Sequence, residues 1–332
     1  MAMERAESIR ELCLACQSEL SQAASTEVRS PRSAPAGILN VNKPPGPTSH
    51  DVVDRIRAAS GVRRVGHAGT LDPSASGVLL VCMGQATRVS EYLMESEKSY
   101  DAWIQLGITT DTGDAEGNVV RRVPDIDTTR ERVLEALHLF RGPIEQVPPM
   151  HSALKHQGVT LYRLARRGIE VERAPRTVEI HDLRLTEWTP PSFRVFIECS
   201  KGTYIRALAA DLGEALGTGA HLEQLMRVAC GPYRMGDAVS LHEAERSFSN
   251  GRWPQILHRL DEALLHLEAF VVDAETEAKI RYGQQIEGPK PRDSLLCRTY
   301  THSGVFLAIL QYDQGSKTWQ PRKVFNLHEA TA

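Results

Sequence analysis

The chain has 332 residues, 41% of them hydrophobic and 24% charged, which is the composition of a globular protein with room for one large domain and one small one. No window approaches the roughly 18 consecutive apolar residues that a membrane helix needs, so a helical membrane protein is excluded. The net charge of −3 excludes a uniformly basic nucleic-acid-binding protein, although a local basic face would still be enough to contact RNA phosphates.

Residues 1–36 are predicted to form a flexible tail, because the tail ends in the polar, proline-containing run STEVRSPRSAPA. One short amphipathic helix is predicted before that run, from the spacing of Ile9, Leu12, Cys16 and Leu20. The start of the chain is rich in glutamate and lacks an apolar segment, so we expect neither a secretory signal nor a transit peptide. The six cysteines show no framework spacing, which favours reduced thiols and a cytoplasmic protein.

Helices and strands are predicted to mix irregularly after the tail. Two capping-box patterns, Thr48 with Asp51 and Thr128 with Glu131, predict where two helices begin. The predicted helices cover 49–59, 85–94, 130–140 and 203–217, and the predicted strands cover 38–42, 78–84, 98–107, 176–188 and 193–200. Without a repeating strand–helix–strand rhythm, this order favours an α+β fold with a mixed, mostly antiparallel central sheet over 37–250. Short β-rich runs with Gly and Pro turns predict a separate small β domain over 262–330.

The stretch from Gly66 to Gly77, GHAGTLDPSASG, places one carboxylate in a preset loop. Its glycines permit backbone conformations that other residues avoid, and Pro73 biases Asp72 toward an extended conformation. An acid held in this way is positioned rather than merely solvated. The alternative is an ordinary turn in which Asp72 bonds to its own backbone.

Possible partners for this acid lie in the segment SKGTYIRAL, where a strand gives way to a helix. Tyr204 and Arg206 are two residues apart and can point the same way, and an arginine beside Asp72 would favour its ionised form. Tyr100 could stack on a base or move a proton. The alternative is that both tyrosines are core aromatics and that Arg206 is a surface charge.

Two basic clusters could meet phosphates. One cluster precedes the glycine-rich loop, at residues 55–64, and the other fills residues 155–176. Either cluster could equally be a solvated surface.

Other motifs give little support for cofactor or metal chemistry. The pair Cys13 and Cys16 lacks the second ligand pair of a zinc site, and the SxxK match at Ser152 lacks its companion motifs. The acidic turn DTGDAEG, residues 111–117, does not have the spacing of a calcium loop. We therefore expect neither a cofactor nor a metal.

Four segments in the same order resemble the TruB family of pseudouridine synthases: LNVNKPPGPTS, GHAGTLDPSASG, KSYDAWIQLGITTDTGDAEG and SKGTYIRAL. The segment GPIEQVPPMHSALKHQGVTLYRLARRGIEV is similar to the RNA-gripping insert of that family, here about 143–175. The resemblance runs from about Gly37 to Tyr233. Beyond residue 250 the chain is similar to the small PUA-like domain of bacterial members.

The resemblance implies a role for individual residues. Asp72 matches the catalytic aspartate, Arg206 its salt-bridge partner, and Tyr100 and Tyr204 the tyrosines of the active site. His67 matches a histidine that enters the RNA loop. The other residues expected to bind RNA are Lys43, Lys155, Arg163, Arg166, Arg167 and Arg227.

The function implied by the resemblance is isomerisation of uridine to pseudouridine at position 55 in the T loop of tRNA, after the base is flipped into a pocket. The expected partner is the T arm of tRNA, with no membrane and no protein partner, and the expected active form is a monomer. Attack at C1′, attack at C6 and a glycal route all remain open. Two alternatives are a guide-RNA-dependent synthase of the same superfamily and an RNA-folding chaperone.

Overall fold

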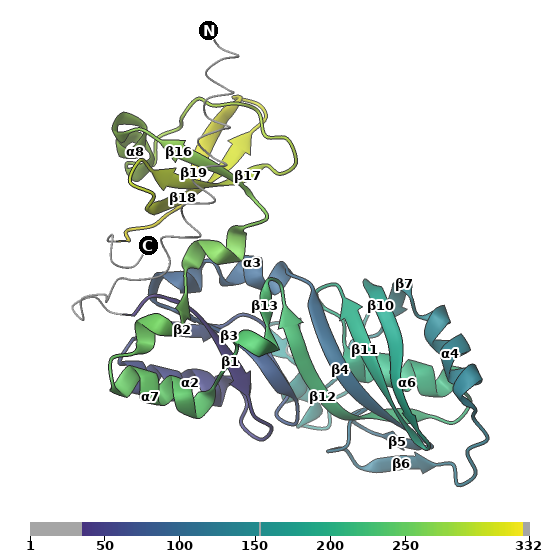
Figure 1. The fold of residues 1–332 in the computed structure, drawn as a ribbon. Coiled ribbons are helices and arrows are strands. Elements are labelled where there is room, and N and C mark those ends of the chain that lie inside the picture. Colours follow the sequence, from purple (N-terminus) through teal and green to yellow (C-terminus); the bar gives the residue numbers. More distant parts are fainter. Residues whose placement is uncertain (1–34, 153, 328–332) are drawn as a thin grey trace.

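Two β-sheets organise the chain in the computed structural model, which describes residues 35–152 and 154–327 (Figure 1). The predicted tail and its short helix lie, apart from residues 35 and 36, outside the described residues, as does the Cys13–Cys16 pair. None of the helices in the described part of the chain is long and apolar enough to cross a membrane.

The larger sheet has 11 strands, and its main path runs β14-β1-β3-β12-β4-β11-β10-β7. The strands of this path are β1 (Gly37–Lys43), β3 (Ser76–Met83), β4 (Lys98–Leu106), β7 (Gly142–Gln146), β10 (Arg176–Thr189), β11 (Ser192–Cys199), β12 (Ala220–Cys230) and β14 (Val239–Ser240). Three short strands pair beside it: β2 (Val65–His67), β13 (Tyr233–Arg234) and β15 (Leu257–His258). In this sheet β1 is parallel to β14 and β3 is parallel to β12, whereas the other pairs are antiparallel. The prediction of a mixed, mostly antiparallel sheet is confirmed.

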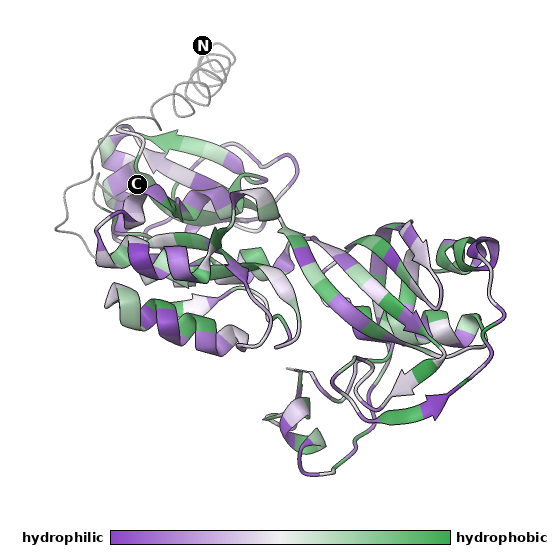
Figure 2. Cartoon of the chain, turned by 60° about the horizontal axis from the view of Figure 1, so that its bottom comes forward, coloured by the Kyte–Doolittle hydropathy of each residue, from purple (hydrophilic) through white to green (hydrophobic). Residues whose placement is uncertain are grey.

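One face of the sheet is covered by helices in the half that contains β4, β11 and β10. Burial alternates strictly along β4 and β11, and the apolar and polar bands of these strands are visible in Figure 2. The buried side packs on α4 (Arg130–Leu139) and α6 (Ile205–Ala215); in Figure 1 α6 lies behind the strands and α4 lies to the right of β10. The half-exposed side carries mostly polar residues, with Trp103 and Phe196 as exceptions, as expected for an antiparallel sheet with one solvated face.

Two predicted helix starts have different outcomes. At α2 (Ser49–Ser60) the capping box of Thr48 and Asp51 is present in both directions, so this prediction is confirmed. At α4 the prediction of Thr128 is wrong by one residue, because Thr129 is the N-cap and its side chain accepts from the Arg132 amide. Adjacent threonines are equally able to cap, and the sequence pattern alone does not select between them.

The predicted helix over 85–94 is also wrong in its continuity. Residues Gly84–Arg88 form a 3-10 turn, and α3 (Ser90–Glu95) begins after Val89. The buried side chains of Ala86, Val89 and Leu93 pack into one core on both sides of the break. Tertiary packing therefore overrides the local preference for one continuous helix.

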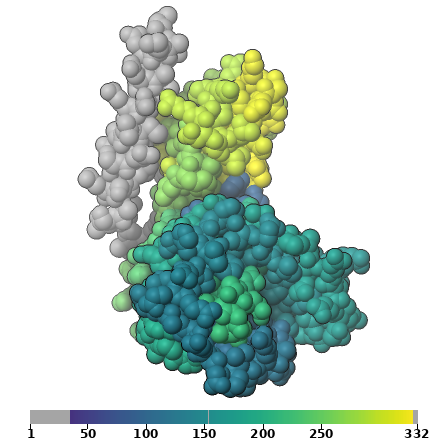
Figure 3. Space-filling view, turned by 90° about the vertical axis from the view of Figure 1, so that its right-hand side faces the viewer, coloured from purple at the N-terminus to yellow at the C-terminus, as the bar shows by residue number. Residues whose placement is uncertain are grey.

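The C-terminal domain has its own sheet, in the order β16-β17-β18-β19. Its strands are β16 (Glu268–Val272), β17 (Leu296–Thr301), β18 (Phe306–Asp313) and β19 (Thr318–Val324), and α8 (Ala274–Arg281) follows the first of them. The domain stacks on one end of the large domain (Figure 3). Its Phe306 and Phe325 share a hydrophobic core with Ile38, Val78 and Leu80 of the large sheet.

The remaining strands form two hairpins, β5 (Ile108–Thr110) with β6 (Val119–Arg122) and β8 (Lys155–His156) with β9 (Val159–Thr160). The second hairpin and α5 (Leu161–Ala165) belong to the segment predicted as an insert, which projects from the large domain as a lobe (Figure 3). Helix α7 (Leu241–Ser249) lies beside α2 (Figure 1). The described cysteines are buried free thiols.

Candidate active site

The loop between β2 and β3 holds Asp72 at its tip, and its far end is fixed by a close approach of two backbones. Gly77, with φ of +100°, pairs with Arg227 on β12, and a Cβ at Gly77 would lie 2.2 Å from the Arg227 carbonyl oxygen. This position requires a glycine. Within the loop, the Ala75 amide donates to the Asp72 carbonyl, and the Gly46 amide donates to the Pro73 carbonyl.

Arg206 lies directly against the Asp72 carboxylate. Its Nε is 3.0 Å from Oδ2 of Asp72, and its side chain is only 6% exposed at the start of α6. The remaining guanidinium nitrogens donate to the backbone carbonyls of Thr112 and His151. The guanidinium is therefore fixed by several partners and cannot reorient without breaking them. The structure places the two residues as the sequence predicted, and it does not support the alternative that Arg206 is a surface charge.

A second carboxylate completes this cluster, and sequence reasoning missed it. Oδ2 of Asp114 lies 3.4 Å from Arg206, and the Thr112 hydroxyl donates to its other oxygen. Asp114 belongs to the acidic turn 111–117, which lacks the spacing of a calcium loop and carried no expected site residue. Its presence within a segment that resembles the TruB family was the available signal. Among the described residues, no group of three or more potential ligands is placed to hold a metal ion.

The charge state of Asp72 reflects opposing effects. Burial raises the pKa of the Asp72 carboxyl and the Asp114 charge adds to this effect, whereas Arg206 and Lys43 lower the pKa. The net shift is upward, because burial outweighs Arg206, which favours the ionised form as expected. Because the side chain is still 37% exposed, water moderates the burial effect.

The two tyrosines occupy different environments. Tyr100 on β4 is 8% exposed, and burial raises the pKa of its phenol to about 12, so the phenol is neutral at physiological pH. Tyr204 is the N-cap residue of α6, where Gln146 bonds to both its amide and its carbonyl. Burial raises the pKa of Tyr204 too, and its neighbours include Ser152 and Arg206.

Lys43 and Arg227 are buried, which is inconsistent with the prediction that they contact RNA. Lys43 is 0% exposed, and its ammonium group donates to the carbonyls of Pro44, Pro47 and Pro73. Burial lowers the pKa of Lys43 to about 8. Arg227 is 1% exposed and donates to three backbone carbonyls. A match to a basic residue type does not reveal whether the charge faces solvent or the loop.

His67 ends β2 at the start of the loop. Its ring makes an edge-on contact with His50, with 5.7 Å between the ring centroids. Burial lowers the pKa of His67 to about 4, so the ring is neutral near pH 7. Its Nδ1 is buried and has no hydrogen-bond partner within the described part of the chain.

Four basic residues of the insert are exposed, which fits both RNA binding and a solvated surface. Lys155, Arg163, Arg166 and Arg167 all face solvent. Arg163 and Arg166 both lie over the ring of Tyr162, each 5.9 Å from its centroid. The cluster is available to a negatively charged partner.

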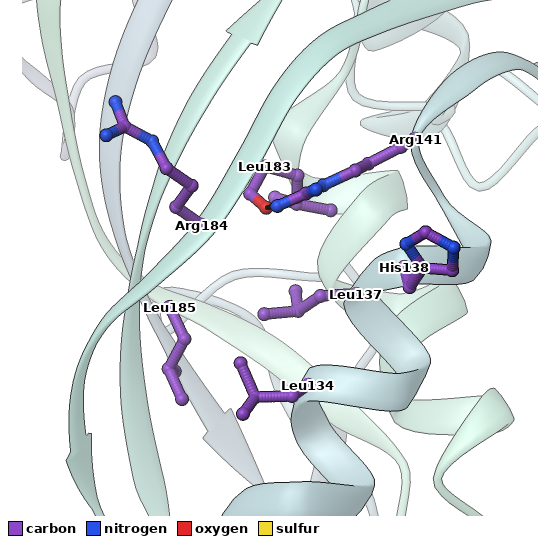
Figure 4. A pocket seen from close by; sticks show the side chains of 7 residues that line it. All are labelled: Leu134, Leu137, His138, Arg141, Leu183, Arg184 and Leu185. Atoms are coloured by element: carbon purple, nitrogen blue, oxygen red, sulfur yellow. Dashed lines mark hydrogen bonds between the residues drawn. The ribbon is translucent and has the colours of Figure 1, made fainter.

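Two cavities lie in very different surroundings. The one at Asp72 and Arg206 is small, about 20 Å³, and it is also lined by Ser74, Asp114 and Leu222. A larger cavity of about 310 Å³ lies between α4 and β10 (Figure 4). It is lined by Leu134, Leu137, His138, Arg141, Leu183, Arg184 and Leu185. Arg141 donates to the Leu183 carbonyl there, and the lining contains no carboxylate side chain, so we place the active site at Asp72.

Comparison with known proteins agrees with this geometry. Residues 57–205 match the TruB family pseudouridylate synthase N-terminal domain, and residues 206–272 match the tRNA pseudouridylate synthase B C-terminal domain. A protein of Dehalococcoides mccartyi called tRNA pseudouridine synthase B is 43% identical, over 87% of this chain and 96% of the relative. A protein of the same name from Thiobacillus denitrificans is 42% identical, over 86% and 94%.

Among solved structures, a chain in the crystal structure of a Cbf5-Nop10-Gar1 complex superimposes with a TM-score of 0.69 at 25% identity, covering 91% of each chain. The fold and the acid-bearing loop define a pseudouridine synthase with an α+β catalytic domain. The chain belongs to the TruB family.

Proposed function

We propose that this protein isomerises uridine to pseudouridine at position 55 in the T loop of tRNA. The observation that carries the proposal is the ion pair between Asp72 and Arg206, whose Oδ2 and Nε are 3.0 Å apart. Asp72 lies on the loop that resembles the family's catalytic motif. The relatives called tRNA pseudouridine synthase B support tRNA as the substrate.

The reaction rearranges bonds within one nucleotide. The bond between N1 of uracil and C1′ of ribose breaks, the detached base turns, and C5 bonds to C1′. The proton leaves C5 and N1 gains one, so atoms and charges balance without a cofactor. Asp72 promotes the cleavage, and its route through C1′, C6 or a glycal stays open. Arg206 orients the carboxylate and offsets part of the burial effect.

The tyrosine and histidine are suited to neutral, aromatic roles. We infer that the ring of Tyr100 stacks on the flipped uracil. Its phenol is protonated at physiological pH, so it would have to ionise before it could accept a proton. The uncharged ring of His67 can take the place of the extruded base in the RNA stack. Tyr204 closes the side of the site next to the insert.

We propose that the site widens to admit a base. The cavity at Asp72 and Arg206 is only about 20 Å³ in the structure. The His151 carbonyl, at the edge of the insert, accepts a hydrogen bond from Arg206. We propose that tRNA binds the exposed arginines of the insert and moves this segment, while phosphate contacts position the T arm. In this proposal the enzyme acts as a monomer and needs no protein partner.

A guide-RNA-dependent synthase of the same superfamily is the second candidate, and the fold also matches a chain of a Cbf5-Nop10-Gar1 complex. The identity of 25% in that comparison is well below the 43% shared with a relative called tRNA pseudouridine synthase B. An RNA-folding chaperone would use the same surface without requiring Asp72.

One experiment separates these functions. Purified protein is mixed with an unmodified tRNA transcript, without guide RNA, and pseudouridine is mapped. We expect product at position 55 with the unaltered protein, none with Asp72→Asn, and full activity with Asp101→Asn. Asp101→Asn is the control. Asp101 pairs with Arg194 at 2.6 Å and lies on the face of β4 opposite Tyr100. Substantial turnover by Asp72→Asn, or a requirement for guide RNA, would contradict the proposal.

A further inference from the structure

Arg227 is a buried cation that lies between the catalytic loop and the strand of Tyr100. Its Nε donates to the Val78 carbonyl at 2.7 Å, and its two terminal nitrogens donate to the carbonyls of Thr70 and Gly69 at 3.3 and 3.1 Å. These acceptors lie on β3 and on the part of the loop that precedes Asp72. The guanidinium also interacts with the phenol of Tyr100, where it opposes the effect of burial on the pKa.

The strand register explains how one side chain reaches all these groups. On β12, Arg227 pairs with Gly77 of β3 on one side and with Tyr100 of β4 on the other. A register shift between Arg227 and Ala229 marks an irregularity in the pairing with β4. Irregularities of this kind re-aim a side chain, and directly paired residues on one face lie close enough to interact.

Within the described chain, the partners of this guanidinium are carbonyl oxygens and a phenol rather than a carboxylate. Burying a charge costs folding free energy unless its hydrogen-bond donors find acceptors. The acceptors of Arg227 are not carboxylates, so an ion pair does not explain why this charge is buried. The planar fork of arginine can serve several acceptors in fixed directions, whereas the single ammonium group of lysine cannot span them.

We propose that Arg227 is a positioning residue for the isomerisation: its guanidinium fixes the loop that carries Asp72 relative to the Tyr100 ring. The role rests on the proposed function, and it differs from the RNA contact expected of Arg227 from the sequence. In this proposal Arg227, which is 1% exposed, acts through the placement of these two side chains.

The test compares two matched buried arginines. Arg298 in the C-terminal domain is 8% exposed and likewise donates to a backbone carbonyl, that of Leu267, and to a tyrosine hydroxyl, that of Tyr300. Each methionine variant removes one buried guanidinium, with donors to three backbone carbonyls at Arg227 and to one carbonyl and one tyrosine hydroxyl at Arg298. Single-turnover rates on tRNA transcript, tRNA affinity, melting temperature and hydrogen–deuterium exchange of residues 66–77 are measured for both variants.

We expect Arg227→Met to lower the single-turnover rate by about 100-fold, because a displacement near 1 Å can cost that much. Its tRNA dissociation constant should stay within about threefold of the unaltered value, because the loss is confined to the transition state. The loop amides should exchange at least about tenfold faster, since their local structure opens more readily. Arg298→Met should lower the melting temperature while leaving both the rate and the loop exchange unchanged.

Arg227→Lys provides a second variant if the methionine variant does not fold. This variant should fold. Its single-turnover rate should exceed that of Arg227→Met by less than about tenfold, because one ammonium group serves fewer of the carbonyls. An unchanged rate in a folded Arg227 variant, an equal loss in Arg298→Met, or unchanged loop exchange would overturn the proposal. If the unaltered protein makes no pseudouridine, the proposed function fails, while the exchange experiment still decides whether Arg227 fixes the loop.

Discussion

Replacing Arg206 with methionine tests the electrostatics of the active site most directly. The change removes the cation that lies 3.0 Å from Asp72 and 3.4 Å from Asp114, together with its bonds to two backbone carbonyls. Asp72 and Asp114 then lose the cation they share, and Lys43 remains as a cation that lowers the pKa of Asp72. Because the Asp114 charge already raises the pKa of Asp72, losing Arg206 raises that pKa further.

The expected loss of stability follows from burial. Removing one partner of a buried ion pair costs about 3–5 kcal/mol, and the 37% exposure of Asp72 places the expected loss near the lower end, about 3 kcal/mol. A carboxyl with a raised pKa in the folded state stabilises the fold at low pH and loses this contribution as pH rises through that pKa. The deficit of Arg206→Met should therefore be smaller in acid than at neutral pH.

Denaturant unfolding near pH 4 and pH 7.5 measures this difference, and single-turnover rates against pH should show the acid limb moved to higher pH. Arg206→Lys keeps the charge and should retain part of the stability. The matched control is Arg194→Met, which breaks the exposed pair with Asp101 and should cost at most about 1 kcal/mol. A variant at position 206 with unaltered stability and an unaltered pH profile would refute the argument.

Two further predictions concern RNA binding and acid stability. Replacing Arg163, Arg166 and Arg167 together with glutamate should weaken tRNA binding. It should also reduce the slope of log affinity against log salt by about 0.7–0.9 for each phosphate that is no longer neutralised. Unchanged affinity in a titration would show that these exposed arginines are only solvated. The His67 pKa of about 4, against an ordinary value of 6.5, means that the unfolded state binds a proton first as pH falls below 6.5. From pH 7.5 to pH 5 this should cost about 2 kcal/mol of unfolding free energy, a loss that His67→Gln should remove in denaturant titrations; equal pH slopes for both proteins would contradict it.

The sequence predicted best where local chemistry and burial agree. The capping box at Thr48 and the alternating strand over 98–107 are confirmed, because a side-chain cap and a two-residue repeat are local signals. The predicted cap at Thr128 and the predicted helix over 85–94 were wrong. Packing decides between neighbouring caps, and it interrupts the helix at Val89. Both errors concern where an element begins or continues, which local pattern specifies least.

At the active site, the sequence predicted which residue types matter better than what each one contacts. Asp72 and Arg206 lie 134 positions apart and meet as predicted, because the motifs that contain them were recognised together. Lys43 and Arg227 were expected to bind RNA, Lys43 from its place in the motif LNVNKPPGPTS, whereas their burial depends on strands far away in the chain. Asp114 was missed because its partner is contributed by another element of the fold.

The shared core between the domains has a consequence for how the molecule unfolds. Ala68, in the loop that carries Asp72, belongs to the same buried cluster as Phe306 and Phe325 of the C-terminal domain. Arg88 adds a bond to the Val324 carbonyl and lies over the ring of Phe325. A domain seated in this way cannot swing on a linker, and heat or denaturant should melt both domains in one cooperative transition. An RNA that touches both domains therefore meets surfaces at a fixed separation.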